Sequence, residues 1–466
     1  MQELKAISPI DGRYRAKVDA LANYFSEAAL IRYRVRVEVE YLIALTKQPG
    51  LGLRDLTEAE LTQLRSIYKD FSFDDAINVK AKESVINHDV KSVEYLLKDK
   101  LSDNSLEDLK EWIHFALTSE DINNLSYALM ICEAVNDVML PCIAELQNKL
   151  DAMAEEYKST AILARTHGQS ASPTTFGKEF KVFAQRIQRQ VKQIQSFTML
   201  AKLNGATGNY NAHQVAFPNI DWQEFTTSFI NTLNQDLTIK LEANLYTTQI
   251  ESHDTLAEIS DIFSRLNTIV ISFDQDIWRY ISDGWIIQKA NDKEVGSSTM
   301  PHKVNPIDFE NSEGNLGLAN ALFGFFKTKL PISRLQRDLT DSTVLRNFGI
   351  AFAYSLLAYK STLKGLSKTK VNQARVQASL DEHPEVLAEA IQTVMRREGL
   401  AIPYEQLKTL TRGKKVTTED FKHFIQELDL DSAIKVELSK LEPANYIGIA
   451  EQLASGLEPD IGCVKV

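Results

Sequence analysis

Apolar and charged residues alternate at helical spacing through the N-terminal third of the chain. Intervals of three and four predict one helix from Glu27 to Thr46 and a second from Leu53 to Phe71. A third pattern runs from Lys80 to Leu101, but Asn87-His88-Asp89 interrupts it. Because such polar residues favour caps and turns over helix interiors, this cluster has a role other than helix propagation.

The middle of the chain carries longer patterns. Their apolar residues form seams at spacings of three and four over Pro141–Tyr157, Ser172–Phe197, His253–Ile287, the segment after Pro306, and Val344–Leu366. Helices of this kind exceed the usual length of about 12 residues. They predict a bundle whose seams also serve subunit association, with a monomeric helical core as the alternative.

The pattern shortens after Lys368. Helical segments at Gln373–Leu380 and Glu385–Arg397, separated from later ones by glycine and proline, predict a smaller helical domain. Alternating strand patterns are scarce, and the one hairpin that we expect lies between Gly205 and Pro218. The predicted fold class is therefore all-α.

Length and charge restrict the class of function. A chain of 466 residues is too long for one hydrophobic core, so two or three domains are expected. The formal net charge of −11 argues against nucleic-acid binding, and an anionic substrate would need a local basic pocket. No run of eighteen apolar residues occurs and the N-terminus lacks a signal-peptide core, so we expect no membrane association.

Cysteine usage bears on the cellular compartment. The three cysteines, Cys132, Cys142 and Cys463, are odd in number and lack metal-ligand spacing with any histidine. This usage favours a reducing, cytoplasmic location. Cys132 lies in an apolar helical run, where we expect a core residue and not a nucleophile.

One polar stretch, Val295–Glu310, combines groups that suit a carboxylate. It holds several hydroxyl side chains and Lys303, and Asn305-Pro306 predicts an N-cap followed by proline at the first helical position. A helix starting there directs free N–H groups and the positive end of its dipole at the loop. The alternative is a polar loop that only caps a helix.

A histidine stands in a second polar stretch, Arg165–Gln169, which we interpret as a loop leading to a helix. A histidine with a pKa near neutrality is the default general acid for protonating a leaving nitrogen. The alternative for His167 is a structural role. The neighbours of His167 are polar, and Gly168 follows directly, so the histidine has no apolar cover. The general-acid role and the structural role are therefore equally compatible with this sequence.

Thr118–Asn124 is a dense polar run before an apolar helix. Its simpler interpretation is a capping box, with Thr118 or Ser119 as the N-cap and acids in the first turn. Asn123 and Asn124 are not needed for capping, which leaves them for ligand contact.

Two more polar stretches, Thr247–Asp254 and Ser333–Asn347, precede the third and fifth long helices. The second stretch places arginines and hydroxyls near a helix start, which is the chemistry that a phosphate needs. A charged surface connection is the alternative. If the polar clusters converge at the ends of a bundle, the site would suit a substrate with a phosphate and two carboxylates.

The order Gly-Ser-Ser-x-Met-Pro-x-Lys-x-Asn-Pro, from Gly296 to Pro306, resembles the signature loop of the fumarase/aspartase superfamily. Enzymes of that superfamily break a C–N or C–O bond β to a carboxylate and release fumarate. Together with the other polar clusters, Arg13-Tyr14 and the C-terminal Pro443–Gly448, the chain is similar over essentially its whole length to the adenylosuccinate lyase family.

This resemblance implies an all-α fold with a central long-helix bundle, in three domains that we place at 1–114, 115–367 and 368–466. It implies a homotetramer formed through the bundle, with active sites shared between subunits. The implied reactions are cleavage of adenylosuccinate to AMP and fumarate, and of the succinyl-carboxamide ribotide SAICAR to AICAR and fumarate. No metal or organic cofactor is implied.

The resemblance also implies roles for residues. Ser297 would be the general base and His167 the general acid, with His88 positioning the substrate, while Lys303 and Asn305 would hold the carboxylate of the departing fumarate. The implied phosphate-holding residues are Arg13, Tyr14, Arg337, Ser342, Thr343 and Arg346, and further substrate contacts are Asn87, Asp89, Thr118, Ser119 and Gln249. Ser252 departs from the family, whose bacterial members often carry proline there, and puts only local loop geometry in doubt.

Two other functions stay open. A superfamily relative could act on argininosuccinate, aspartate or malate, although the arginine-rich segment 333–347 favours a nucleotide and Thr166-His167 favours adenylosuccinate. A non-catalytic helical scaffold is the second, and it would have no reason to keep Ser297, His167, Lys303 and Asn305 together.

Overall fold

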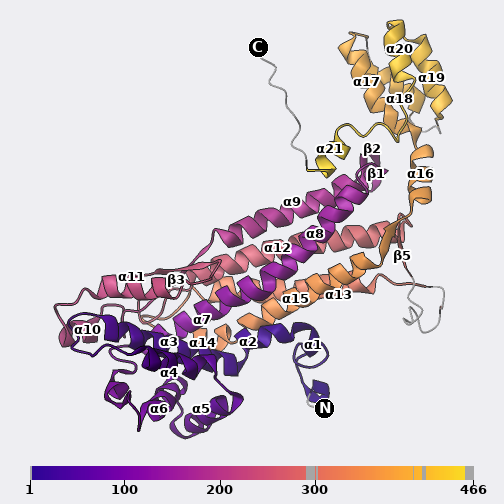
Figure 1. The fold of residues 1–466 in the computed structure, drawn as a ribbon. Helices are drawn as coiled ribbons and strands as arrows, with labels where there is room; N and C mark the ends of the chain where they lie inside the picture. Colours follow the sequence, from indigo (N-terminus) through magenta and orange to yellow (C-terminus); the bar gives the residue numbers. More distant parts are fainter. Residues whose placement is uncertain (1–2, 290–299, 301–302, 402, 412–415, 457–466) are drawn as a thin grey trace. The chain divides into compact units, whose positions relative to one another are not determined.

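The structure is a computed structural model that describes residues 3–289, 300, 303–401, 403–411 and 416–456. Helices make up most of these residues, and the strands among them form only three two-stranded sheets (Figure 1). The predicted all-α class is therefore confirmed at the level of a mostly helical fold.

The N-terminal elements are short helices around one long one. They are η1 (Glu3–Lys5), α1 (Arg15–Val18), η2 (Asp19–Leu21), α2 (Ala22–Phe25), α3 (Glu27–Lys47), α4 (Glu58–Lys69), α5 (Phe73–Ile86), α6 (Asp89–Leu101), η3 (Glu107–Trp112), α7 (Ser119–Ala134) and the π-helix η4 (Val135–Met139).

The middle of the chain holds the longest helices. Its helices are α8 (Leu140–Glu156), α9 (Phe176–Gln195), α10 (Asn211–Ala216), α11 (Trp222–Thr232), α12 (Asp254–Ser282), α13 (Ile307–Lys329), α14 (Thr340–Leu345) and α15 (Phe348–Ser367). The strands are β1 (Ala161–Thr166), β2 (Gln169–Thr175), β3 (Thr198–Ala201), β4 (Lys240–Ala243), β5 (Ile286–Gln288) and β6 (Thr369–Val371).

The C-terminal helices are short, as the shortened pattern predicted. They are α16 (Gln373–Asp381), η5 (Pro384–Leu387), α17 (Ala388–Arg397), α18 (Pro403–Thr411), α19 (Thr418–Glu427), α20 (Ser432–Leu438) and α21 (Ala450–Ala454). Apolar residues of η5 and α17 to α20, among them Leu387, Ile391, Phe421 and Ile425, pack into one cluster.

The chain forms two compact units, each assembled from separate stretches. Unit 1 comprises Met1–Ala144, Arg189–Ile271 and Ser312–Lys360, and unit 2 comprises Glu145–Gln188, Ser272–Asn311 and Ser361–Val466. The division into three consecutive domains at 114 and 367 stays a prediction.

Helix α3 organises the N-terminal part of unit 1. Its apolar residues Ile31, Val35, Val39 and Leu42 share one core with residues of α4, α5, α6 and η3, and Figure 1 shows these helices grouped around it. Burial of these apolar side chains is the main stabilising contribution to the packing of α3 against its neighbours. It contributes about 25 cal/mol for each Å² of apolar surface removed from water.

Local capping accounts for where the predicted N-terminal helices differ from the observed ones. Helix α4 begins only at Glu58, because Thr57 and Glu60 form a capping box in which each side chain accepts the other's backbone N–H. The helical pattern from Lys80 to Leu101 is interrupted at Asn87-His88-Asp89, as the polar residues there indicated. It is divided into α5 and α6 at Asn87, which adopts a left-handed conformation with φ 56°.

A β-hairpin stands where a loop was expected around His167. Strands β1 and β2 pair antiparallel, with Thr166 opposite Gln169, so His167 and Gly168 form the two-residue turn. Both have positive φ, 53° and 74°, as a type I′ hairpin turn requires. The following helix accordingly begins at Phe176 and not at Ser172.

The hairpin predicted between Gly205 and Pro218 is wrong. That segment contains helix α10, and the nearby strands β3 and β4 form a parallel pair instead. Gly205 and Gly208 adopt positive φ angles in the turn that precedes this helix.

A continuous helical run, Ser119–Glu156, is long and apolar enough by composition to cross a membrane. However, 61% of its most apolar window is buried inside the protein, as in the core helix of a globular protein. Cys132 and Cys142 lie on this run as buried free thiols, and burial raises the pKa of Cys132, as expected of a core residue.

Candidate functional site

The Asn87-His88-Asp89 cluster forms the junction between α5 and α6. The Asn87 N–H donates to the carbonyl of Glu83, and His88 is the N-cap of α6, its Nδ1 accepting the N–H of Lys91 at 3.1 Å. Because Nδ1 is an acceptor there, the neutral imidazole carries its proton on Nε2. The exposed His88 ring is thus a fixed hydrogen-bond donor.

Asp89 joins this junction to two arginines. Its Oδ2 accepts from Arg34 Nη2 at 2.7 Å and from Arg346 Nη2 at 3.2 Å. Burial opposes ionisation of this carboxyl, but the Arg34 guanidinium and the Val90 N–H outweigh it and hold the pKa of Asp89 below its ordinary value. Asp89 is therefore a carboxylate held between two cations.

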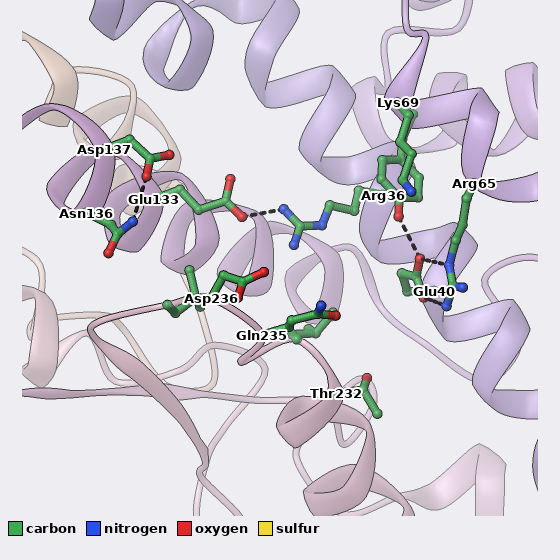
Figure 2. Close-up of a pocket in the computed structure, with 13 residues that line it drawn as sticks. Arg36, Glu40, Arg65, Lys69, Glu133, Asn136, Asp137, Thr232, Gln235 and Asp236 are labelled. Carbon is green, nitrogen blue, oxygen red and sulfur yellow. Dashed lines mark hydrogen bonds and ion pairs between the residues drawn. The ribbon is translucent and has the colours of Figure 1, made fainter.

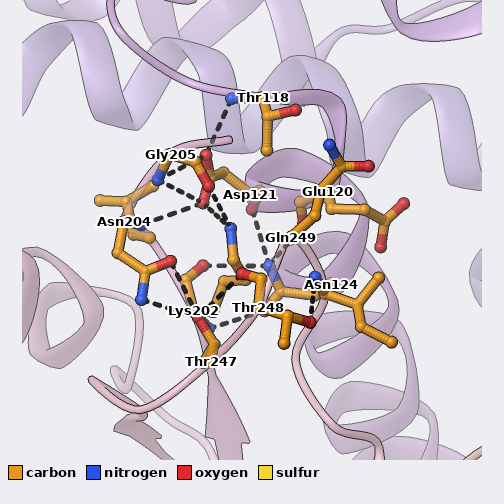
Figure 3. A network of polar contacts seen from close by, with 12 residues as sticks. Thr118, Glu120, Asp121, Asn124, Lys202, Asn204, Gly205, Thr247, Thr248 and Gln249 are labelled. Atoms are coloured by element: carbon orange, nitrogen blue, oxygen red, sulfur yellow. Dashed lines mark hydrogen bonds and ion pairs between the residues drawn. The ribbon is translucent and has the colours of Figure 1, made fainter. Parts of the chain in front are cut away.

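The capping-box interpretation of Thr118–Asn124 is confirmed in its main feature. Thr118 precedes α7, and its N–H donates to Asp121 Oδ2 at 2.8 Å. Asp121 also accepts from Lys202 Nζ at 2.7 Å and from the N–H of Asn204 at 3.0 Å (Figure 3). One carboxylate thus caps α7 and anchors the segment that follows β3.

The two asparagines of this run are both engaged inside the protein. Asn124 accepts the Lys202 N–H and donates to its carbonyl, as a backbone partner would (Figure 3). Asn123 donates to Glu120 Oε1 at 2.7 Å and accepts from Arg34 Nε at 2.9 Å. Their amides serve the fold, although the sequence left them for ligand contact.

Arg337 reaches the same end of α7. Its Nη2 lies 2.8 Å from Glu120 Oε1, and its Nη1 donates to Gln249 Oε1 at 3.5 Å. Burial raises the pKa of Glu120. The nearby Arg337 lowers it and the nearby Asp341 raises it, and the net effect is a raised pKa. The Arg337 Nε is buried and has no hydrogen-bond partner among the residues described.

The segment Ser333–Asn347 is more than a charged surface connection. Asp338 caps its short helix by accepting the Thr340 N–H, and hydrogen bonds from Thr340 lower the pKa of Asp338 to about 2. Arg346 donates to the carbonyl and the hydroxyl of Ser342, while Thr343 is exposed beside it. Arg337 and Arg346 of this segment therefore contact acids from distant parts of the chain.

The N-terminal pair Arg13-Tyr14 lies directly before α1. The Arg13 guanidinium is exposed and lies 5.8 Å from the centre of the Tyr14 ring. The adjoining residues line a cavity of about 370 Å³, whose wall includes Glu27 and Arg346. This segment therefore borders the arginine that holds Asp89.

Four of the predicted polar clusters thus converge within unit 1 of a single chain. The convergent segments are Asn87–Asp89, Thr118–Asn124, the loop containing Gln249, and Ser333–Asn347. Glu251 accepts the N–H of His253, which has a positive φ, so the loop at Ser252 is held without a proline.

Unit 2 contains His167, Lys303 and Asn305. His167 is exposed at the tip of the β1–β2 hairpin. Arg165, two residues before it, anchors the hairpin, because its Nη1 lies 3.2 Å from Asp283 Oδ2 and its guanidinium stacks over Trp285. An exposed imidazole on an anchored hairpin is free to meet a ligand.

The other predicted unit 2 residues lead into α13. The Lys303 N–H donates to the Met300 carbonyl, and the carbonyl of Pro306 accepts from Phe309 at the first turn of the helix. Helix α13 begins at Ile307, one residue later than the predicted proline start. Ser297 lies outside the described residues.

A separate cleft of about 550 Å³ in unit 1 is lined by none of the predicted residues (Figure 2). Its arginines are neutralised, since Arg36 lies 2.5 Å from Glu133 and Arg65 lies 2.8 Å from Glu40. The converged clusters, which bring Arg337 and Arg346 together with the starts of α6 and α7, are the better candidate for an anion site. Among the residues described, no group of three or more histidine, cysteine or acidic side chains is arranged to hold a metal ion.

Arg34 and Glu120 are site residues that the sequence reasoning missed. Arg34 is 1% exposed. It falls on the apolar face of α3, four residues after Leu30 and three before Val37, where a charge is unexpected. That position was an available signal for a buried, partnered arginine. Glu120 belongs to the polar run Thr118–Asn124, but the sequence assigned it only to the acidic first turn of the helix and gave no sign of its contact with Arg337.

Comparison with known proteins identifies the family. The profile described as Lyase matches residues 12–321, and the one described as Adenylosuccinate lyase C-terminal matches residues 333–447. Adenylosuccinate lyase of Vibrio cholerae is 51% identical over 98% of this chain and 100% of its own length. The chain belongs to the adenylosuccinate lyase family. Family members from Escherichia coli and Dictyostelium discoideum are each 49% identical, over 98% and 96% of this chain and 100% and 97% of their own lengths.

Solved structures of more distant proteins share the fold of this family member. A fumarate lyase from Mesorhizobium has a TM-score of 0.72 at 16% identity and covers 94% of this chain and 97% of its own. A 3-carboxy-cis,cis-muconate lactonizing enzyme from Pseudomonas putida has a TM-score of 0.72 at 17% identity, over 95% and 97% of the two chains. These similarities show that the chain shares its fold with both enzymes.

Proposed function

We propose that the protein cleaves adenylosuccinate to AMP and fumarate, and SAICAR to AICAR and fumarate, as a C–N lyase of purine biosynthesis. The observation that carries the proposal is the identity of about half of all positions with adenylosuccinate lyases over nearly the full length of both chains. The convergence of arginines and helix starts in unit 1 supports a phosphorylated, anionic substrate.

The reaction is a β-elimination. Ser297 takes the proton from the carbon beside a carboxylate, the released electron pair forms the C=C bond of fumarate, and the C–N bond breaks. The electrons of that bond pass to the purine amino nitrogen, which takes a proton from His167. His88, a fixed Nε2–H donor, positions the substrate.

Negative charge that develops on the carboxylate must be stabilised. Lys303 and Asn305 hold this carboxylate, and the start of α13 directs its dipole toward it, each donor contributing a few kcal/mol to the transition state. The same cationic surroundings favour the alkoxide form that a serine base needs.

The phosphate is held by residues of the arginine-rich segment and the N-terminus. These are Arg13, Tyr14, Arg337, Ser342, Thr343 and Arg346. Of the two arginines in this set that contact acids, Arg337 has 16% and Arg346 36% of its side chain exposed. The remaining substrate contacts are Asn87, Asp89, Thr118, Ser119 and Gln249, none of which is fully buried.

The working form is a homotetramer that shares each site between subunits. One face of α13 supports this proposal, because it is exposed and uncharged, with the small residues Gly314, Gly317 and Ala321 beside Leu318 and Phe325. Leu318 and Phe325 are each 51% exposed and lie seven residues apart, the spacing of a helix–helix seam. The protein works in the cytoplasm, to which its buried free thiols are suited.

The test is direct. The purified protein is incubated with adenylosuccinate, and fumarate is followed by absorbance while AMP is identified by chromatography. Parallel incubations with argininosuccinate, aspartate and malate test the other superfamily substrates. Equimolar fumarate and AMP support the proposal, fumarate from one of the other substrates alone reassigns it, and no product from any substrate supports a non-catalytic scaffold.

A further inference from the structure

Six side chains of unit 1 form one unbroken chain of polar contacts from Arg337 to Arg346, both in the Ser333–Asn347 segment. The successive links are Arg337 Nη2 to Glu120 Oε1 (2.8 Å), Asn123 Nδ2 to Glu120 Oε1 (2.7 Å), Arg34 Nε to Asn123 Oδ1 (2.9 Å), Arg34 Nη2 to Asp89 Oδ2 (2.7 Å) and Arg346 Nη2 to Asp89 Oδ2 (3.2 Å). The chain joins α3, α6 and α7 to that segment.

The middle of this chain is shielded from water, and its ends are not. The side chains of Glu120 and Arg34 are 3% and 2% exposed, whereas those of Arg337 and Arg346 are 16% and 36% exposed. Polar contacts are stronger in a water-poor interior than at the surface, so the middle is the rigid part. The ends present guanidinium groups to a ligand.

Charge alternates along the chain, and one member is neutral. Arg337, Arg34 and Arg346 are cations, each separated from the next by Glu120 or Asp89. Asn123 stands between Glu120 and Arg34, donating to the carboxylate and accepting from the guanidinium. A primary amide can donate to Glu120 and accept from Arg34 at the same time. A carboxylate could only accept and an ammonium could only donate, so neither could make both contacts.

We propose that Asn123 is a positioning residue: its amide orients Glu120 and Arg34, and through them the two arginines that bind the substrate's phosphate. The inference rests on the proposed function only in that the ligand of these arginines is a phosphate. Asn123 touches no substrate itself, since 7% of its surface is exposed and both ends of its amide are engaged.

Asn123→Leu is the decisive variant, because it removes both links without leaving a charge in place of the amide. Arg34→Lys is the second variant, which keeps the cation beside Asp89 but loses the Nε donor to Asn123. Ser126→Ala is the matched control: Ser126 is a buried polar residue of the same helix, but its hydroxyl bonds only the carbonyl of Ile122 in that helix.

Equilibrium binding of AMP and fumarate, and the KM and kcat for adenylosuccinate, are measured for the full-length protein and each variant. We expect Asn123→Leu and Arg34→Lys to weaken AMP binding and raise KM by about tenfold, the usual consequence of losing one well-placed polar contact. Fumarate binding and kcat should stay within about twofold, and Ser126→Ala should resemble the wild type.

Three results would overturn the inference: unchanged AMP binding in the folded variants, equal weakening of AMP and fumarate, or a lower kcat at unchanged KM. If Asn123→Leu fails to fold, Arg34→Lys decides. A wild type that binds AMP but releases no fumarate contradicts the proposed function and leaves the AMP comparison valid. A wild type that binds no AMP overturns the inference itself.

Discussion

The ammonium of Lys202 lies 2.7 Å from the Oδ1 of Asp121, and neither side chain has any exposed surface. Lys202 also donates to the Gly205 carbonyl, and Asp121 accepts the backbone N–H groups of Thr118 and Asn204. The pair therefore joins the start of α7 to the segment after β3 without contact with water.

Breaking this pair should destabilise the protein strongly. Asp121→Asn leaves the Lys202 ammonium buried without a counter-charge, and we expect the free energy of unfolding to fall by about 3–5 kcal/mol. Urea unfolding followed by circular dichroism measures the change. The control is Lys158→Met, which breaks a solvent-screened pair with Glu155 and should leave the free energy of unfolding nearly unchanged. Equal losses in both variants would contradict the buried-pair argument.

Acid should weaken the protein through His213. This histidine is 1% exposed, and burial lowers its pKa from 6.5 to about 4, outweighing the opposing attraction of Asp121. The unfolded chain binds a proton near pH 6.5 and the folded protein does not, so stability is lost as pH falls from 6.5 towards 4. The loss from this group is about 3 kcal/mol.

His213→Phe should flatten that part of the pH profile, because a phenyl ring fits between Tyr210 and Trp222 without a titrating group. Free energies of unfolding measured from pH 7 to pH 4.5 should converge or cross for the two proteins. His423→Phe, at an exposed position, should keep the wild-type slope. A parallel decline of wild type and His213→Phe would show that His213 is not the group involved.

The proposed acid and base predict two inactive proteins. Ser297→Ala and His167→Ala should each fold normally and lower the turnover of adenylosuccinate by about 10²–10⁴, the usual contribution of a positioned proton-transfer group. His423→Ala is the control for loss of an exposed histidine. Initial rates of fumarate release give the answer, and near-normal turnover in either variant would refute the role of that residue.

Sharing of sites between subunits predicts complementation. When Ser297→Ala and His167→Ala proteins are mixed under conditions that exchange subunits, some sites receive both native residues, and part of the activity should return. Subunit exchange is verified with differently tagged chains. Continued inactivity after verified exchange would count against shared sites.

The exposed face of α13 predicts the effect of a charge there. Phe325→Glu places a carboxylate on the proposed seam, and burying it unpaired would be costly, so we expect smaller particles and lost activity. Light scattering coupled to size-exclusion chromatography gives the mass. Val436→Glu, at a residue of α20 that is 54% exposed, should leave the assembly intact. An unchanged mass for Phe325→Glu would place the subunit contact elsewhere.

Local periodicity predicted the long helices well, because the pattern that defines an amphipathic helix lies within the helix itself. Helix α3 begins at Glu27 as expected, and α12 begins at Asp254, one residue after the predicted start. The β1–β2 hairpin was not predicted. Its turn requires a left-handed conformation at His167, which is uncommon for a residue other than glycine, and Gly168 was the only turn signal in the sequence.

The amino-acid sequence alone determined that the protein is helical, to which family it is similar, and which residue types carry its proposed chemistry. Tertiary structure decided which polar residues are partners. Arg34 meets Asn123, 89 residues away, and Arg346 meets Asp89, 257 residues away. The periodicity of apolar residues shows which side chains of one segment face the core and which face solvent. A hydrogen bond between distant segments leaves no such local pattern, because its geometry exists only once both helices are packed.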